Sequence, residues 1–284
     1  MFVPRKILED KLKQILTGDI GQGDVTAQAI IPPNLMVIAI VLAKEAGTVA
    51  GIEEAVILAE SLGLKGTAKV TDGSAVENKQ VLMEISGDAQ TLLCLERTLL
   101  NVLSRMSGIA TATRTLAQKL QETGCKARIA ATRKSAPGLL YFDKKAVLIG
   151  GGDPHRLHLD DMVLIKDNHI AIIGSVEEAV KTAKTNTSFT KKIEVEVTDS
   201  SDALRAAKAG ADIIMLDNFE PAQAKATAEI LSRMGFGDVL LEISGNVTGE
   251  NLLEYAEADV DIISLGFLTH SAKALDISLE IIKE

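Results

Sequence analysis

The sequence predicts an α/β protein in which a small α+β layer precedes a parallel sheet that closes, or nearly closes, into a barrel. Over the second half of the 284-residue chain, short apolar runs alternate with helical stretches, as they do in βαβ units. Hydrophobic residues make up 46% of the chain and aromatic residues only 3%, so we expect a core of Ile, Leu, Val and Ala, as in buried parallel sheets. A chain of this length can hold one barrel and a small partner domain.

The first hundred residues predict the α+β layer, because they mix the 3.6-residue apolar period of helices with the short apolar runs typical of strands. A glycine-rich loop follows the first helix, and Asp24 at its end is expected to be a turn or cap residue. The predicted elements, in chain order, are a helix over residues 6–16, a loop over 18–24, a strand over 36–43, a helix over 53–62 and a strand over 81–86.

A helical pattern follows over residues 89–121, and Ser107-Gly108 within it predicts a break and the domain boundary. We therefore expect one domain over residues 1–106 and a second over 107–271, with the amphipathic segment 272–284 returning to the first domain. Six apolar runs in the second domain predict the strands of the parallel sheet, at residues 127–132, 162–165, 193–197, 211–216, 239–243 and 260–265.

Polar residues lie within or directly after these six runs. Because the carboxyl ends of the strands in a parallel barrel share one mouth, we expect these side chains to converge on a single pocket. The residues at or just after the strand ends are Arg133, Lys134, Lys166, Asp217, Ser244-Gly245-Asn246 and Gly266, and the third run contains Glu194 and Glu196.

Such a pocket would suit anionic ligands. Arginine forks fit carboxylates and phosphates, and lysine supplies a point charge. Two carboxylates, Glu196 and Asp217, would repel a polyanion unless a divalent cation lay between them, and Mg²⁺ binds to one or two carboxylates together with substrate phosphate oxygens. The turns at residues 244–246 and at Gly266 could present backbone N–H groups to a phosphate. The cationic candidates are Arg133, Lys134, Arg156 and Lys166.

Each of these residues also has a purely structural interpretation. Lys134 and Lys166 could be solvated charges at strand ends, and Glu194 or Glu196 could pair with a lysine between sheet and helices. The glycines at 150–152 predict a tight loop that aims the residues after it. A histidine beside polar residues is more often hydrogen-bonded scaffold than catalyst, which applies to His155, His158, His169 and His270.

The overall composition argues against several classes of protein. A net charge of −9 argues against a general nucleic-acid or anionic-membrane surface, so we expect no nucleic-acid or membrane partner. The two cysteines, Cys94 and Cys125, form no disulfide framework or metal motif, which indicates a reducing compartment. The amphipathic start of the chain lacks the apolar core of a signal peptide, and we expect a cytoplasmic protein.

Several segments, in their order and spacing, resemble the quinolinate phosphoribosyltransferase family, also called carboxylating nicotinate-nucleotide pyrophosphorylases. The resemblance runs from about residue 23 to residue 279, and the ordered set is far more specific than any one motif. The segments are ERTLLN from Glu96, SGIAT from Ser107, TRK from Thr132, GGGDPHR ending at Arg156, LIKDNH ending at His169, IEVEV, MLDNF and EISGNV.

The resemblance implies an incomplete parallel α/β barrel with an N-terminal α/β sandwich, which the tail 272–284 joins. It also implies a homodimer, or a higher homo-oligomer of dimers, in which one subunit's sandwich caps its neighbour's barrel. The helix residue Arg97, which would otherwise be taken for a surface charge, would then reach the neighbour's active site.

By position, the resemblance assigns roles to individual residues. Lys134, Lys166, Glu196 and Asp217 are expected to take part in catalysis, and the two carboxylates to lie near the ribose and Mg²⁺. Ser244-Gly245-Asn246 and Leu265-Gly266 match the turns that hold the 5′-phosphate. The residues that match binding positions for quinolinate and phosphoribosyl pyrophosphate are Arg133, Lys134, His155, Arg156 and Lys166.

One segment departs from the family pattern. Ala136 stands where the family often has a polar residue, and Leu140 stands where it usually has arginine, so the surroundings of the carboxylate pocket differ.

The resemblance implies that the chain transfers a phosphoribosyl group from phosphoribosyl pyrophosphate to quinolinate and releases CO₂. The products would be nicotinate mononucleotide and pyrophosphate, as in de novo NAD biosynthesis. Three alternatives remain open. They are a paralogue linked to molybdenum transport with another ring substrate, a barrel lyase using Lys166 as a Schiff base, and a non-catalytic binding protein.

Overall fold

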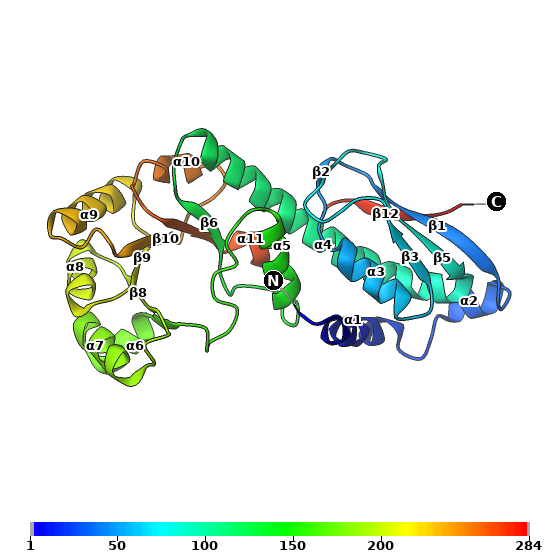
Figure 1. Ribbon diagram of the computed structural model, residues 1–284, viewed down its shortest axis with the longest axis horizontal. Helices are drawn as coiled ribbons and strands as arrows, with labels where there is room; N and C mark the ends of the chain where they lie inside the picture. Colours follow the sequence, from blue (N-terminus) through cyan, green and yellow to red (C-terminus); the bar gives the residue numbers. More distant parts are fainter. Residues whose placement is uncertain (1–2, 283–284) are drawn as a thin grey trace. The chain divides into compact units, whose positions relative to one another are not determined.

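The computed structural model describes residues 3–282 (Figure 1). The described chain divides into two compact units. The first contains residues 3–114, Tyr141–Gly151 and residues 272–282, and the second contains Thr115–Leu140 and Gly152–Ser271. The division differs from the boundaries expected from the sequence in two ways: it falls eight residues later, and helix α5 (Leu140–Ile149) lies mostly in the first unit.

The first unit contains a four-stranded antiparallel sheet with strand order β12-β1-β5-β3. The tail of the chain supplies β12, which pairs with β1 from Ile38↔Ile282 to Ala43↔Ile277. The tail strand therefore belongs to the sheet of the first unit, and residues 283–284 lie outside the described range. The strands are β1 (Met36–Ala43), β3 (Lys65–Ala68), β5 (Val81–Asp88) and β12 (Ile277–Ile282), and the short strands β2 (Gly47–Thr48) and β4 (Ala75–Val76) pair separately.

Three helices accompany this sheet, α1 (Arg5–Ile20), α2 (Val25–Ile30) and α3 (Ile52–Glu60). Helix α3 packs on β3 and on α1. Asp24 caps α2, because its carboxylate accepts hydrogen bonds from the N–H groups of Thr26 and Ala27, as the sequence predicted. Helix α1 continues through Gly18 to Ile20, so the loop predicted over residues 18–24 begins later than expected.

The long helix α4 (Ala89–Glu122) is continuous, so the break predicted at Ser107-Gly108 is wrong. The two small residues serve close packing instead. The Ser107 hydroxyl accepts a hydrogen bond of 3.0 Å from the Ala50 N–H. A Cβ on Gly108 would lie 1.9 Å from the carbonyl oxygen of Lys273, so only glycine lets the tail approach the helix this closely.

Buried ion pairs hold α5 within the first unit. The fully buried carboxylate of Asp143 accepts hydrogen bonds of 2.7 and 2.8 Å from Arg105 on α4. Lys145 contacts Glu54, at 2.7 Å, and Glu53. Burial raises the pKa of Glu54, and the positive charge of Lys145 partly offsets this effect. Asp143 and Lys145 therefore each have a partner of opposite sign, as a low-dielectric interior requires.

The second unit contains a six-stranded parallel sheet with the order β6-β11-β10-β9-β8-β7. No ladder joins β6 to β7 among the described residues, so the sheet is a barrel with an open wall, which confirms the predicted incomplete barrel. All six predicted strands are confirmed, with ends within two residues. They are β6 (Arg128–Ala131), β7 (Val163–Ile165), β8 (Ile193–Val197), β9 (Ile213–Asp217), β10 (Leu240–Ser244) and β11 (Ile262–Leu265).

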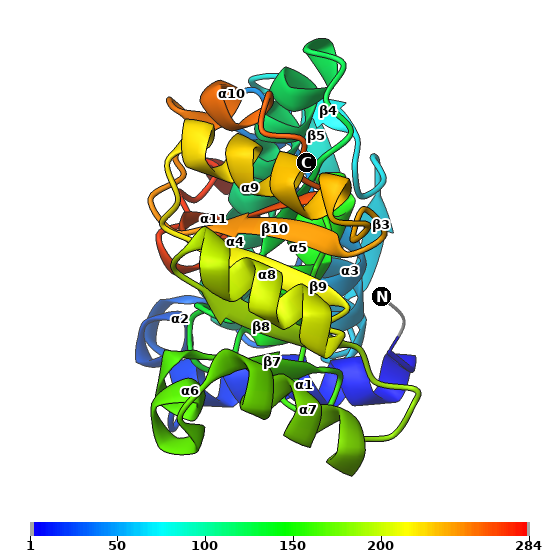
Figure 2. The same cartoon turned by 90° about the vertical axis from the view of Figure 1, so that its left-hand side faces the viewer.

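Helices cover the outer face of this sheet, as Figure 2 shows for α7, α8 and α9 in front of β8 to β10. The residues before the first turns of α7, α8 and α9 are Ser175, Asp199 and Glu220. The Ser175 and Asp199 side chains cap their helices by accepting a hydrogen bond from a backbone N–H, and α9 has proline in its first turn. No helix within residues 3–282 has the length and apolar character needed to cross a membrane. The helices of this unit, after the end of α4, are α6 (Asp167–Ile173), α7 (Val176–Asn186), α8 (Ser200–Ala209), α9 (Pro221–Arg233), α10 (Leu252–Tyr255) and α11 (Phe267–His270).

Candidate active site

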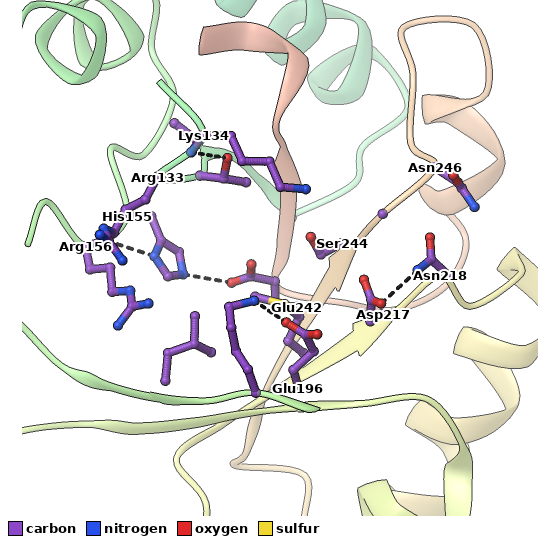
Figure 3. Close-up of a pocket in the computed structure, with 16 residues that line it drawn as sticks. Arg133, Lys134, His155, Arg156, Glu196, Asp217, Asn218, Glu242, Ser244 and Asn246 are labelled. Atoms are coloured by element: carbon purple, nitrogen blue, oxygen red, sulfur yellow. Dashed lines mark hydrogen bonds and ion pairs between the residues drawn. The ribbon is translucent and has the colours of Figure 1, made fainter. Parts of the chain in front are cut away.

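A cavity of about 540 Å³ opens at the carboxyl ends of the barrel strands, entirely within the second unit. Its two sides differ in chemistry: Arg133, His155 and Arg156 lie on one side, and Asp217, Asn218 and Asn246 lie on the other (Figure 3). The lining residues are Ala131, Thr132, Arg133, Lys134, His155, Arg156, Leu164, Lys166, Glu196, Met215, Asp217, Asn218, Glu242, Ser244, Gly245 and Asn246.

The end of β6 supplies Arg133 and Lys134. Directly after the strand, the Thr132 hydroxyl accepts a hydrogen bond of 3.1 Å from the Lys134 N–H and so turns the chain at the cavity rim. Thr269 on α11 donates to the Lys134 carbonyl at 2.7 Å and fixes the same turn from the other side. Arg133 and Lys134 remain exposed, as groups that meet a soluble anion must be.

The ends of β7 and β8 meet in an ion pair between Lys166 and Glu196. The backbone N–H of Lys166 donates to Nδ1 of His169 at 3.0 Å, so His169 helps to cap α6, which confirms its interpretation as scaffold. A Schiff-base lysine must be neutral to attack a carbonyl, which a desolvated or cation-flanked site achieves. Lys166 is paired with a carboxylate and its side chain is about half exposed, so it has neither of these surroundings, and the geometry argues against the lyase alternative.

Asp217 at the end of β9 lies opposite Glu196. Its Oδ2 accepts a hydrogen bond of 2.7 Å from the side-chain amide of Asn218, and the Asn218 backbone N–H donates to the Ser244 carbonyl at 2.9 Å. Burial raises the pKa of Asp217, and the negative charge of Glu196 raises it further. Two carboxylates that repel each other across a cavity have the donor chemistry that Mg²⁺ prefers, so the residues present fit this ion.

The turn after β10 packs closely against the end of β9. Gly245 and Asn246 both have left-handed backbones, with φ angles of 80° and 52°. A Cβ on Gly245 would lie 2.3 Å from Oδ1 of Asn218, so glycine is required at this position. Successive left-handed residues leave backbone N–H groups directed outward, which suits a phosphate.

His155 and Arg156 follow the glycine loop at residues 150–152. The His155 ring points into the barrel, where Nε2 lies 3.1 Å from Oε2 of Glu242 and 3.4 Å from Oε2 of Glu194 (Figure 3). Burial opposes a charge on this ring, but the hydrogen bonds and negative charges of the two carboxylates outweigh it and raise the pKa of His155 to about 10. Burial also raises the pKa of Glu194.

Comparisons with known proteins decide the family. The family model for the C-terminal domain of quinolinate phosphoribosyl transferase matches residues 109–280, and the model for the N-terminal domain matches residues 24–107. The chain belongs to the quinolinate phosphoribosyltransferase family.

Members of this family from distant organisms are similar over nearly the whole chain. A probable nicotinate-nucleotide pyrophosphorylase [carboxylating] of Methanothermobacter thermautotrophicus is 45% identical over 96% of this chain and 98% of that protein. The nicotinate-nucleotide pyrophosphorylase [carboxylating] of Homo sapiens is 38% identical over 84% and 80%. The solved structure of the nicotinate-nucleotide pyrophosphorylase from Ehrlichia chaffeensis matches with a TM-score of 0.89 and 33% identity, over 99% of both chains. These names give no support to the alternative linked to molybdenum transport.

The structure brings ten of the residues predicted for this quinolinate phosphoribosyltransferase site together around one cavity. Three others do not line it. Arg97 is exposed on α4 in the first unit, and Leu265 is buried in the barrel core. Gly266 packs against the Lys134 side chain, since a Cβ on Gly266 would lie 3.2 Å from Cδ of Lys134. The ten residues are Arg133, Lys134, His155, Arg156, Lys166, Glu196, Asp217, Ser244, Gly245 and Asn246.

The sequence prediction missed Glu242 and gave no site role to Asn218. Glu242 interrupts the apolar strand Leu240–Ser244, and a charge inside a buried strand was the available signal. Asn218 stands beside Asp217 in the sequence, but its role depends on a left-handed backbone, with φ of 57°, that turns its amide back. Ala136 and Leu140, where the chain departs from the family pattern, do not line the cavity.

Proposed function

We propose that the protein transfers the phosphoribosyl group of phosphoribosyl pyrophosphate to the ring nitrogen of quinolinate and that the product then loses CO₂. The observation that carries this proposal is the convergence of four cationic side chains and two carboxylates on one cavity, from the ends of β6, β7, β8 and β9 and from the loop before β7. A dicarboxylate and a pyrophosphate need cations, whereas the ribose between them needs groups that tolerate developing positive charge.

The cationic side of the cavity would bind quinolinate. Arg133 and Arg156 offer planar forks that match carboxylates, and Lys166, paired with Glu196, lines the same cavity. The turn at Ser244-Gly245-Asn246 would hold the 5′-phosphate through its backbone N–H groups. In this arrangement the ring nitrogen faces the anomeric carbon, and alignment of the two reactants removes much of the entropic cost of their reaction.

Glu196 and Asp217 would hold Mg²⁺ together with oxygens of the substrate. When bound, the ion supplies positive charge to the pyrophosphate and makes it a better leaving group. The negative field of the two carboxylates also lies where the ribose gains oxocarbenium character.

In the transfer step, the bond between the anomeric carbon and oxygen breaks and its electron pair leaves with pyrophosphate. The ring nitrogen forms the new bond to the anomeric carbon, and the ring becomes a pyridinium. The bond from the ring to the adjacent carboxylate then breaks, CO₂ departs, and the electron pair stays on the ring carbon, where a proton from water replaces it. The cationic ring stabilises that pair. Arg133 and Arg156 would hold the second carboxylate, which remains in nicotinate mononucleotide.

A direct assay tests the proposal. The protein is mixed with quinolinate, phosphoribosyl pyrophosphate and Mg²⁺, and nicotinate mononucleotide and CO₂ are measured, with nicotinate in place of quinolinate as the control substrate. Arg133→Ala and Lys166→Ala should each reduce kcat/KM by about 100-fold or more, because each removes a charge from the reacting centre. Lys208→Ala, at an exposed position on α8, is the matched surface control. Near-normal turnover in both cavity variants would contradict the assignment.

We also propose that the enzyme is cytoplasmic and forms homodimers in which Arg97 contributes to the partner's site. Support comes from the exposure of Arg97 on α4 and from its position in a family motif. Inactive Arg97→Ala and Lys166→Ala subunits, mixed by co-expression, should regain activity, because a hybrid dimer keeps one intact site. Random pairing predicts about a quarter of the wild-type sites. No recovery in purified hybrid dimers would overturn this role for Arg97.

A further inference from the structure

Two carboxylates, Glu194 and Glu242, are fully buried in the barrel and take no part in the reaction described above. They lie on β8 and β10. Glu242 is in register with Met215, which is in register with Glu196, so Glu242 and Glu196 lie in the same layer of barrel side chains. Glu194 is one layer deeper, in register with Ile213.

These carboxylates are poorly satisfied. Within residues 3–282, neither Glu194 oxygen and only one Glu242 oxygen has a hydrogen-bond partner. Replacement of a whole buried ionic group by apolar residues would avoid the cost of burying charge, and such replacements are often neutral or stabilising. Stability alone therefore does not explain why these strands carry glutamates.

Both glutamates contact His155, and the ring has no nitrogen left for substrate. Nε2 lies 3.1 Å from Glu242 and 3.4 Å from Glu194. Nδ1 accepts a hydrogen bond of 2.8 Å from the backbone N–H of Arg156. Because Nδ1 is the acceptor in this hydrogen bond, Nε2 is the ring nitrogen that donates toward the carboxylates. We call His155, Glu194 and Glu242 the histidine cluster.

The histidine cluster connects the segment beside β6 to strands β8 and β10. Asp153 pairs with β6: its N–H donates to the Ile129 carbonyl at 2.7 Å, and its carbonyl accepts from the Ala131 N–H at 3.0 Å. Two residues later, His155 has a left-handed backbone with φ of 53°, and its N–H donates to Oδ1 of Asp153 at 2.7 Å. The ring then crosses the interior to β8 and β10.

From this geometry we propose that Glu194 and Glu242 are positioning residues, which act through His155 to hold the backbone of Arg156 so that its guanidinium faces quinolinate. The inference rests on the proposed function. It changes the role that the family resemblance gives to His155, from a substrate ligand to an anchor for the next residue. A strained, left-handed turn persists only when its surroundings hold it, and here the cluster supplies that restraint.

The kinetic consequence is specific to one substrate. Arg156 lies on the cationic side of the cavity, away from Asp217 and the 5′-phosphate turn (Figure 3). Misplacement of a binding group by about 1 Å can reduce turnover by about 100-fold. Loss of the anchor should therefore raise KM for quinolinate by about 10- to 100-fold and change KM for phosphoribosyl pyrophosphate by less than about threefold.

The test uses Glu242→Leu, Glu194→Leu and the conservative variant Glu242→Gln, whose amide oxygen can still accept from Nε2. Both leucine variants should show the selective rise in KM for quinolinate, measured under conditions in which far-UV circular dichroism shows that they remain folded. Glu242→Gln should recover most of the affinity. The control is Asp261→Asn, which neutralises another carboxylate of the same sheet, bonded to the Leu241 N–H at 2.8 Å. It should leave both KM values unchanged.

Two kinetic results would overturn the proposal. One is an unchanged KM for quinolinate in well-folded variants, which would make the cluster only a structural feature. The other is an equal loss of affinity for both substrates, which would mean general collapse of the cavity.

A spectroscopic measurement separates this inference from the proposed function. If the wild-type protein forms no nicotinate mononucleotide, the function fails, but the anchor can still be tested without substrate. The ¹⁵N signals of the His155 ring and the Arg156 guanidinium should both shift in Glu242→Gln and stay in place in Asp261→Asn. An Arg156 signal that does not respond to Glu242→Gln or Glu242→Leu would refute the coupling.

Discussion

Replacement of Gly108 by alanine should destabilise the protein, although the same change in a helix normally stabilises. Gly108 lies inside α4, where alanine is favoured over glycine by about 1 kcal/mol. The new Cβ, however, would lie 1.9 Å from the Lys273 carbonyl oxygen and 3.0 Å from Cα of Ala274. Both contacts are with backbone, which cannot rotate away as a side chain can.

The magnitude follows from the distance. A carbon–oxygen contact needs about 3.4 Å, so the tail must withdraw by about 1.5 Å. This movement breaks the hydrogen bond from the Leu275 N–H to the Ser104 carbonyl, now 3.0 Å, and strains the one from the Lys44 N–H to Asp276, now 2.8 Å. Two weakened hydrogen bonds cost about 1 kcal/mol each, and overpacking adds about 1–3 kcal/mol. After the helix gain of about 1 kcal/mol, the free energy of unfolding should fall by about 2–4 kcal/mol.

Urea unfolding followed by far-UV circular dichroism gives the stability, and hydrogen exchange of the amides in β12 reports the tail directly. The matched control is Gly18→Ala, also within a helix, where no heavy atom lies within 4 Å of the new Cβ. It should stabilise by about 0.5–1 kcal/mol. If Gly108→Ala is as stable as Gly18→Ala and exchange in β12 is unchanged, the packing argument is refuted.

Three further predictions concern charged groups. Arg105→Ala should lower the free energy of unfolding by about 3–5 kcal/mol, because it leaves the buried Asp143 carboxylate without its bidentate partner; a loss below about 1 kcal/mol in urea unfolding would contradict this. The pKa of His155 rises from 6.5 to about 10 on folding, so this group contributes stability below pH 6.5 that is lost as the pH rises through 10. Between pH 6.5 and 10, the fall in the free energy of unfolding, measured with urea, should be smaller in Glu242→Gln than in the wild type. An identical pH profile in the two proteins would contradict the role of Glu242 in raising the pKa of His155. Asp217→Asn should raise the Mg²⁺ concentration for half-maximal activity by about 10-fold, whereas an unchanged requirement would remove Asp217 from the metal site.

The sequence was sufficient for the barrel strands, because each one is a short apolar run that ends in polar residues. Both features are local, and β8 was predicted to the residue at Ile193–Val197. The convergence of Arg133, Lys166 and Asp217 also followed, since the topology of a parallel sheet brings all carboxyl ends to one mouth.

Predictions failed where a residue's role depends on a contact distant in sequence. Ser107-Gly108 has the composition of a helix break, yet the helix continues because the segment from Lys273 needs the space that a Cβ would fill. Glu242 received no role from the sequence, and only the fold shows that His155, 87 residues earlier in the chain, contacts it. Glu194 and Glu196 alternate identically in the sequence, but depth in the barrel separates them: one is buried beside His155 and the other pairs with Lys166.

The sequence by itself determined the fold class, the polar residues that follow each strand and the family, because periodicity and motif spacing are properties of the chain. Tertiary structure alone decided which carboxylate faces the cavity, which ring nitrogen of His155 is engaged, and where glycine is indispensable. These depend on distances of a few ångströms between segments far apart in the chain, and on the loss of water around them, which no local pattern encodes.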